Sequence, residues 1–257
     1  TKETVYKKEA AYFAFPVAAA SPEFRYEVQN GVVNPARDMM PGAGLEWFSS
    51  QNWVSVGGEG AEVGLVGVDS FLWTFGDVVR GTWPTKFEPK GSTAFAYVMN
   101  NYWGTNYVAA QGGDFTFRYA LTSAPRLDPA AMSRMGWEQT TRLESTLVKS
   151  QDRVAAGPNL LPAGSMSFMQ TSDPSVFLST WKQAEEGEGS VLRFIELGGG
   201  ARRTVRVSSP LFGVASVRTC NAVEDCADPA APVAADGFSF AAGPRQIQTF
   251  KLQGDGK

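Results

Sequence analysis

The stretch FTFRYALTS, residues 115–123, places a large side chain at every second position. These side chains are Phe115, Phe117, Tyr119 and Leu121. Successive side chains of a β-strand point to opposite faces of the sheet, so all four fall on one face. Similar short runs, broken by Gly, Pro and Asn, recur at residues 24–28, 53–56, 71–79, 93–99, 191–197 and 204–209. The pattern predicts an all-β protein built from antiparallel sheets.

Two turn sequences predict β-hairpins. Asn30-Gly31 lies between the runs at residues 24–28 and 32–33. Asn and Gly both tolerate the positive φ that a tight hairpin turn requires, so this pair predicts a turn between two paired strands. The GGEG sequence at residues 57–60 predicts a second hairpin for the same reason.

A single segment has helical character. Asp128 can cap the first turn of a helix, and Pro129 suits the first helical position. Gly136 weakens the middle of the segment, so we expect a short or broken helix.

The chain is expected to form two β domains. A Pro/Gly/Ser-rich passage, AAGPNLLPAGSMS at residues 155–167, has the composition of a domain boundary. We expect a large β supersandwich at residues 1–160 and a smaller β-sandwich at residues 165–257, with the one short helix between them.

Composition excludes several classes of function. The chain has no histidine, which removes Ser-His-Asp and Cys-His catalysis and zinc sites built on imidazole. Its 23 Lys and Arg against 26 Asp and Glu give a net charge of −3, which does not favour a nucleic-acid partner. No apolar run approaches the about 20 residues that span a bilayer, so no membrane partner is expected.

The two cysteines, Cys220 and Cys226, lie in one short polar stretch. They form either a local disulfide or two free thiols in a surface loop. A disulfide would indicate an oxidising compartment, which for this chain means a secreted or periplasmic location. The loop offers too few ligands for a zinc site.

Carboxylates are the only candidates for acid–base chemistry: Glu46, Asp69, Asp77 and Asp114. A glycosidase needs two carboxylates about 5–9 Å apart across the sugar. The sequence does not bring any two of these together, and capping of turns or pairing with arginine explains each more simply. No catalytic residue is therefore assigned.

An aromatic cluster falls within about sixty positions and includes Trp47, Phe48, Trp53, Trp73, Trp83, Tyr97, Tyr102, Trp103 and Tyr107. The segment MNNYWGTNY, residues 99–107, combines aromatic rings with amide side chains. Rings stack on the apolar faces of sugars and amides bond to hydroxyls. The candidate carbohydrate-binding residues are Asn100, Asn101, Tyr102, Trp103, Asn106 and Tyr107. The alternative is that most of these aromatic rings fill a core between two sheets.

Several motifs resemble, in order, the C-terminal β region of glycoside hydrolase family 38, the α-mannosidases. They are AYFAFPVA (11–18), LEWFSSQNWVSV (45–56), VGLVGVDSFLW (63–73), MNNYWGTNY (99–107), FRYAL (117–121), VLRFIELGGG (191–200) and GPRQIQTFKL (243–252). The opening AFP and MNNYWGTNY are the most specific of them. One position departs from the family, since Gly104 stands where relatives often have His.

This resemblance implies a fold and a division of labour. It implies a supersandwich like that of galactose mutarotase, followed by an immunoglobulin-like sandwich. It also implies that zinc, its ligands and the nucleophile belong to an N-terminal catalytic domain of the same polypeptide, so no cofactor is expected in this chain. The expected function is a non-catalytic C-terminal β region that packs on this domain and completes the rim of its sugar site. The alternatives are a free-standing carbohydrate-binding module and, less favoured without histidine, a mutarotase-like enzyme.

Overall fold

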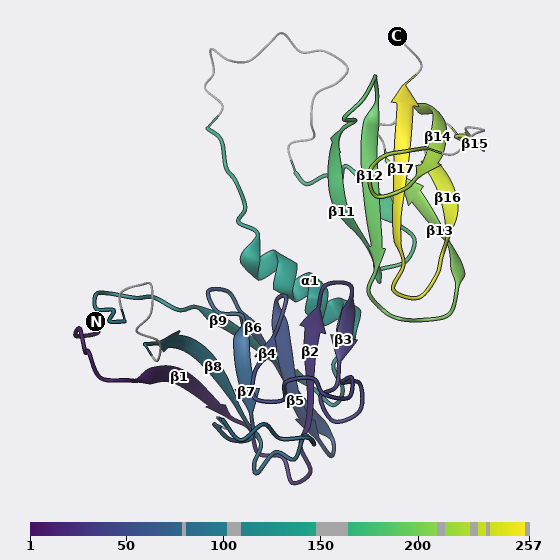
Figure 1. Cartoon of the computed structure of the whole chain (residues 1–257). Helices are drawn as coiled ribbons and strands as arrows, with labels where there is room; N and C mark the ends of the chain where they lie inside the picture. Colours follow the sequence, from purple (N-terminus) through teal and green to yellow (C-terminus); the bar gives the residue numbers. More distant parts are fainter. Residues whose placement is uncertain are drawn as a thin grey trace. The chain divides into compact units, whose positions relative to one another are not determined.

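The computed structural model describes residues 1–78, 81–101, 109–147, 164–209, 214–226, 231–234 and 237–254. The described chain is nearly all β with one short helix, which confirms the predicted fold class (Figure 1). It divides into two compact units, unit 1 at Thr1–Thr141 and unit 2 at Arg142–Lys257. Most of the passage expected to separate two domains, residues 155–163, lies outside the described residues.

Unit 1 contains two antiparallel sheets. The five-stranded sheet has the order β3-β2-β5-β6-β9, with β2 (Glu23–Val28), β3 (Gly31–Val33), β5 (Trp53–Gly58), β6 (Ala61–Gly67) and β9 (Tyr119–Ala124). The four-stranded sheet has the order β1-β8-β7-β4, with β1 (Ala10–Pro16), β4 (Phe48–Ser49), β7 (Leu72–Phe75) and β8 (Thr93–Asn100).

Both predicted hairpins are present. β2 pairs with β3 around Asn30, whose φ is 68°. β5 pairs with β6 around Gly60, whose φ is 78°. Each turn therefore places a residue that tolerates positive φ where the hairpin needs it.

The strand predicted from residue 115 begins later than its alternating pattern suggests. β9 starts at Tyr119, which lies opposite Gly67, the last residue of β6. Phe115 and Phe117 precede the point at which the partner strand ends, so they are not part of the ladder. The alternation of apolar side chains therefore extends to Phe115, although pairing with β6 begins only at Tyr119.

The core of unit 1 lies between its two sheets. Phe24 and Leu65 come from one sheet, and Trp73, Phe75 and Ala96 come from the other. The rings of Phe24 and Phe75 stack with their centroids 4.8 Å apart. Among the described members of the aromatic cluster, Phe48, Trp53 and Trp73 are buried, as the alternative interpretation held, whereas Trp47 and Trp83 are exposed.

The helix α1 (Pro129–Thr140) packs on β5 and β6 (Figure 1). Asp128 caps it by accepting a hydrogen bond from the Ala131 N–H at 2.8 Å, as expected. Of the two expected outcomes, a short helix and a broken one, the structure has the short helix, which continues through Gly136 without a break. A Cβ at Gly136 would lie 2.6 Å from the Cβ of Asn52. The glycine is therefore explained by close packing of the helix on the neighbouring loop.

Charged groups are buried between α1 and the five-stranded sheet. Glu62 accepts hydrogen bonds from Arg25 Nη2 at 2.6 Å, Ser55 Oγ at 2.6 Å and the Leu127 N–H at 2.9 Å. Burial alone would raise the pKa of Glu62, but these donors outweigh it and hold the pKa below its usual value. Glu27 accepts a hydrogen bond from the Ser133 hydroxyl but pairs with no cation among the described residues, so burial dominates and raises its pKa.

Unit 2 is a smaller sandwich of two sheets. The three-stranded sheet has the order β10-β13-β16, with β10 (Gln170–Thr171), β13 (Arg203–Ser208) and β16 (Gly237–Ala242). The five-stranded sheet has the order β11-β12-β17-β14-β15, with β11 (Val176–Gln183), β12 (Ser190–Glu196), β14 (Val214–Cys220), β15 (Ala231–Pro232) and β17 (Ile247–Gly254). Phe194 and Phe250 from one sheet contact Phe240 from the other, with centroids 5.4 Å and 4.9 Å from its ring.

The two cysteines of unit 2 are joined. Cys220, the last residue of β14, forms a disulfide with Cys226. Of the two arrangements that the sequence left open, the structure has the disulfide. In the described part of the chain, no helix has the length and apolar character needed to cross a membrane.

Candidate functional site

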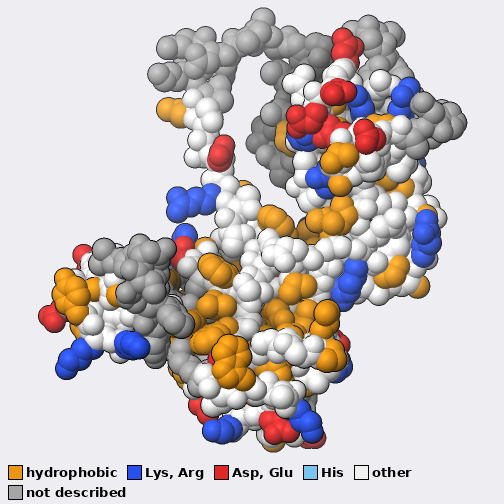
Figure 2. Space-filling view, viewed as in Figure 1, with side chains coloured by type: hydrophobic (Ala, Val, Ile, Leu, Met, Phe, Trp, Pro, Cys, Tyr) orange, Lys and Arg blue, Asp and Glu red, His pale blue; other side chains and the backbone are white. Residues whose placement is uncertain are grey.

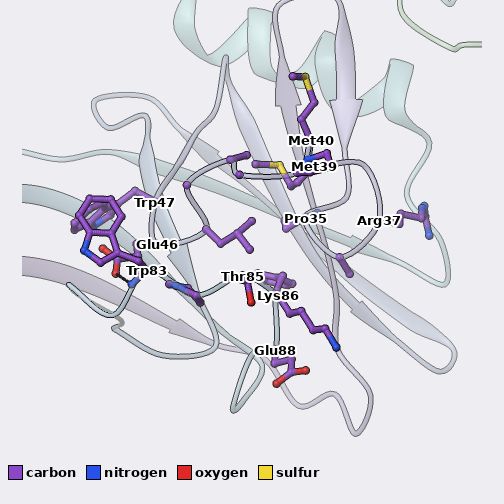
Figure 3. Close-up of a pocket in the computed structure, with 18 residues that line it drawn as sticks. Pro35, Arg37, Met39, Met40, Glu46, Trp47, Trp83, Thr85, Lys86 and Glu88 are labelled. Atoms are coloured by element: carbon purple, nitrogen blue, oxygen red, sulfur yellow. Dashed lines mark hydrogen bonds between the residues drawn. The ribbon is translucent and has the colours of Figure 1, made fainter.

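Unit 1 has a groove between two loops, one at residues 35–47 and one at residues 83–88 (Figure 3). Its volume is about 750 Å³. Sites for small ligands commonly have volumes of about 300–1,000 Å³, so the groove is of suitable size.

Asn34 shapes the first loop at its start. This buried residue accepts a hydrogen bond from the Ala36 N–H at 2.9 Å through its side chain, and its own N–H donates to Asp38 at 2.7 Å. Its amide nitrogen also donates to Glu23 at 2.9 Å. An asparagine side chain that bonds to the backbone two residues ahead favours a tight turn. The loop is therefore fixed to β2 where it leaves the sheet.

Phe87 anchors the second loop. Its ring lies edge-on to Phe24 and Phe48, with centroids 5.9 Å and 5.6 Å away. Both partners are buried in the core of unit 1. Edge-to-face contacts between buried rings stabilise a fixed orientation, so the second loop is held to the core at this point.

Glu46 connects the two loops. Its carboxylate is buried and accepts hydrogen bonds from the N–H groups of Thr82 at 3.0 Å and Trp83 at 3.2 Å (Figure 3). The φ of Trp83 is 49°, in the left-handed region that bulky side chains rarely adopt. The Trp83 side chain is 79% exposed, so burial of its ring does not explain this conformation. A buried carboxylate thus holds an exposed tryptophan on an unfavourable backbone.

A second tryptophan borders the groove and leads to the sheet. The indole of Trp47 stacks on Tyr97 of β8, with centroids 6.1 Å apart and planes 14° apart. Tyr97 in turn stacks on Tyr12 of β1 at 4.5 Å. Tyr97 alternates along β8 with the buried Ala96, so this stack lies on the face of the four-stranded sheet away from the core.

The polar lining of the groove is balanced in charge. Arg37 and Lys86 oppose Glu46 and Glu88. Arg37 pairs with Glu23 at 3.3 Å, outside the lining. Within the part of the chain that the structure describes, no hydrogen bond or ion pair engages the side chains of Thr85, Lys86 and Glu88. The groove therefore offers a hydroxyl, an ammonium and a carboxylate to a ligand.

Only two of the predicted carbohydrate-binding residues are described, and both lie at the end of β8. Asn100 is exposed. Asn101 is buried and bonds to the N-terminal segment: its amide donates to the carbonyls of Val5 at 2.9 Å and Lys7 at 2.8 Å, and its oxygen accepts from the Glu9 N–H. Asn101 therefore joins the end of β8 to the N-terminal segment that precedes β1. The other four predicted residues, Tyr102, Trp103, Asn106 and Tyr107, lie outside the described residues.

The remaining carboxylates considered for catalysis each have a separate partner. Asp69 binds Arg118 through both oxygens at 2.8 Å and 2.9 Å. Asp77 pairs with Lys90 at 3.1 Å, and a hydrogen bond from this lysine lowers the pKa of Asp77. Asp114 accepts a hydrogen bond from the Thr1 hydroxyl. These contacts are the structural roles that the sequence favoured.

The sequence did not indicate the groove, although it contained one signal. Trp83 lies between Gly81 and Pro84, in a stretch without strand alternation. A tryptophan in a Gly/Pro-rich loop is less readily explained by sheet packing than one inside an alternating run. Glu46, for which the sequence favoured a structural role over an acid or base, accepts hydrogen bonds from backbone N–H groups at the second loop.

The fold defines the class of this chain as an all-β protein of two sandwich-like units. The residues present do not suit the zinc ion of a glycosidase: the chain has no histidine, its cysteines are bridged, and its described residues contain no cluster of metal ligands.

Comparison with known proteins places this fold more narrowly. Residues 175–250 match the sequence model of the glycosyl hydrolases family 38 C-terminal beta sandwich domain. No protein with a curated description matches the chain.

Two solved structures from Enterococcus faecalis share the fold. One is an α-mannosidase of strain V583, with a TM-score of 0.64 and 14% identity. The other is a protein of glycosyl hydrolase family 38, with a TM-score of 0.65 and 15% identity. Each similarity covers 95% of this chain but only 26% of the solved chain. The predicted resemblance to the C-terminal β region of family 38 is confirmed.

Proposed function

We propose that this chain is a non-catalytic C-terminal β region of an α-mannosidase-like glycoside hydrolase. The observation that carries the proposal is the coverage: the fold accounts for 95% of this chain but for 26% of chains described as family 38 enzymes. The match of residues 175–250 to the C-terminal sandwich of that family supports the same position. The catalytic groups and the zinc ion then belong to an N-terminal domain of the same polypeptide.

The chemistry of the chain supports a non-catalytic role. A glycosidase needs a pair of carboxylates that face one sugar. The candidates Asp69, Asp77 and Asp114 have separate partners, and Glu46 is occupied by backbone N–H groups. Each carboxylate therefore already has a structural role.

The surface of unit 1 is consistent with a partner domain. Hydrophobic side chains are exposed on the face of unit 1 seen in Figure 2, with charged groups mainly at its margins. Exposed apolar surface of this kind is typical of faces that contact another protein or a ligand. In this proposal the surface packs on the catalytic domain, and the segment from Asn100 to Tyr107 completes the rim of its sugar site.

The first test is hydrolysis of 4-nitrophenyl α-D-mannopyranoside by the purified chain. We expect no release of nitrophenol above the buffer rate, because each of the four candidate carboxylates in the described residues has its own structural partner. Turnover that rises in proportion to the chain and coelutes with it would refute the proposal.

The rim is tested in the longer polypeptide that carries the catalytic domain. There, Trp103→Ala should raise KM for the mannoside, and Trp137→Ala, on the exposed side of α1, serves as the matched control. Equal KM values for both variants and the parent would remove the rim from the proposal but leave the packing role.

A free-standing carbohydrate-binding module is the second candidate function. The exposed Trp83 favours it, because core packing does not account for this ring. The mass of the native polypeptide would distinguish the two candidates, because the first requires a catalytic domain in the same chain and the second does not.

A further inference from the structure

We propose that the groove between residues 35–47 and 83–88 binds a neutral pyranose ring, with the indole of Trp83 as its stacking platform. The proposal goes beyond the accessory role, because it requires no catalytic domain. It also differs in place from the predicted segment at residues 99–107.

The first argument is the conformation of Trp83. Its left-handed backbone is unfavourable, and unfavourable backbone conformations that a protein maintains cluster at functional sites. Here the conformation is maintained by Glu46, a buried carboxylate that bonds to Thr82 and Trp83 across 37 residues of sequence. The result is a tryptophan that is 79% exposed at one edge of the groove, on a backbone that Glu46 holds in place. An exposed aromatic face suits stacking on the C–H face of a sugar ring.

The second argument is the charge of the lining, which identifies the class of ligand. Arg37 and Lys86 balance Glu46 and Glu88. A nucleotide or an acidic glycan would require an excess of cations, and a basic peptide would require an excess of anions. The balance therefore favours an uncharged ligand.

The third argument is the presence of uncommitted polar groups. In the view of Figure 3, Thr85, Lys86 and Glu88 lie away from the two labelled indoles, so they are placed for the hydroxyls of a neighbouring ring of an oligosaccharide such as a disaccharide, and not for the ring stacked on Trp83. Within the described chain their side chains have no hydrogen-bond partner or ion pair. A hydroxyl, three N–H donors and two carboxylate oxygens can together donate to and accept from the several hydroxyls of a sugar.

The fourth argument is preorganisation. Asn34 holds one loop and Phe87 the other, and Glu46 joins the two. Loops that are already fixed lose little conformational freedom when a ligand binds. A sugar, which has a modest apolar area, benefits most from such a site.

The proposal is tested by titrating the whole chain with methyl α-D-mannopyranoside, methyl α-D-glucopyranoside, methyl β-D-galactopyranoside and α-1,2-mannobiose. Isothermal calorimetry and saturation-transfer NMR would detect binding. Trp83→Asn is the decisive variant, because asparagine tolerates a left-handed backbone and keeps the loop while removing the indole. Trp137→Ala removes an indole from α1, outside the groove, and is the matched control.

We expect at least one neutral sugar to bind, with affinity reduced about tenfold or more in Trp83→Asn and unchanged in Trp137→Ala. Circular dichroism would show whether Trp83→Asn remains folded, and Thr85→Ala, a surface change in the same groove, should also weaken binding. Absence of binding by the parent chain to every neutral sugar would overturn the proposal. So would equal binding by the parent and both groove variants, or a preference for D-glucuronate over the neutral sugars. Hydrolysis is not measured, so these outcomes are independent of the accessory role.

Discussion

Replacement of Trp83 by asparagine should have almost no effect on stability, although tryptophan is usually costly to remove. The side chain is 79% exposed, so only about a fifth of it is buried. A buried Trp covers about 150–250 Å², so the lost area is about 30–50 Å², worth about 1 kcal/mol at 25 cal/mol per Å². Relief of the left-handed backbone at 49° should return about 1 kcal/mol. The two effects nearly cancel.

The assay is urea denaturation of unit 1, followed by the fluorescence of the remaining tryptophans. We expect the free energy of unfolding of Trp83→Asn to lie within about 1 kcal/mol of the parent, and Tm within about 4 °C. Trp73→Ala is the contrasting variant, because Trp73 is fully buried and its loss should cost about 3–5 kcal/mol. A loss above about 2 kcal/mol for Trp83→Asn would refute the reasoning, since it would mean that the indole packs against the protein.

Three other changes test features of the fold. Gly136→Ala should destabilise unit 1 by about 1 kcal/mol in urea denaturation. The new Cβ would lie 2.6 Å from the Cβ of Asn52, and this overpacking should cost more than the gain of about 1 kcal/mol in helix propensity; a stabilised variant would contradict this packing. Glu27→Gln should stabilise unit 1 at neutral pH and lose this advantage below pH 4.5. Burial raises the pKa of Glu27, so the parent loses stability as the pH rises through this raised pKa. A difference between the thermal melting curves that does not depend on pH would count against this explanation. Cys226→Ser removes the disulfide to Cys220 and should lower the free energy of unfolding of unit 2 by about 2 kcal/mol. Reduction of the parent should have the same effect. Identical melting of the reduced and oxidised chains would argue against a stabilising disulfide.

The features of the fold that the sequence predicted depend on local interactions. The hairpins at Asn30 and Gly60 form because a few adjacent residues favour positive φ between two apolar runs. The start of α1 follows from Asp128 and Pro129 in the same way. The packing role of Gly136 could not be predicted, because its neighbour Asn52 is distant in sequence and helix propensity alone indicates only a weak point.

The candidate site depended on distant residues and was largely missed. Glu46 and Trp83 are 37 residues apart, and only the folded chain brings the carboxylate to the N–H groups. Asn101 looked like a sugar ligand because its amide lies beside aromatic residues, but its partners are the carbonyls of Val5 and Lys7, more than 90 residues earlier. The sequence shows that an amide stands at this position, but the fold determines which groups this amide bonds to.

The pairing of β1 with β8 has a consequence for the order of folding. The strands β2 and β3, like β5 and β6, are joined by short turns and can associate as soon as they are made. In contrast, Ala10 lies opposite Asn100, so β1 must wait for about ninety residues of intervening chain. Closing so long a loop is slow, and β1 should be the last strand of unit 1 to gain protection in pulse-labelled hydrogen exchange. Asn101 donates a hydrogen bond to the segment before β1, so this bond should also form late, when β1 pairs with β8.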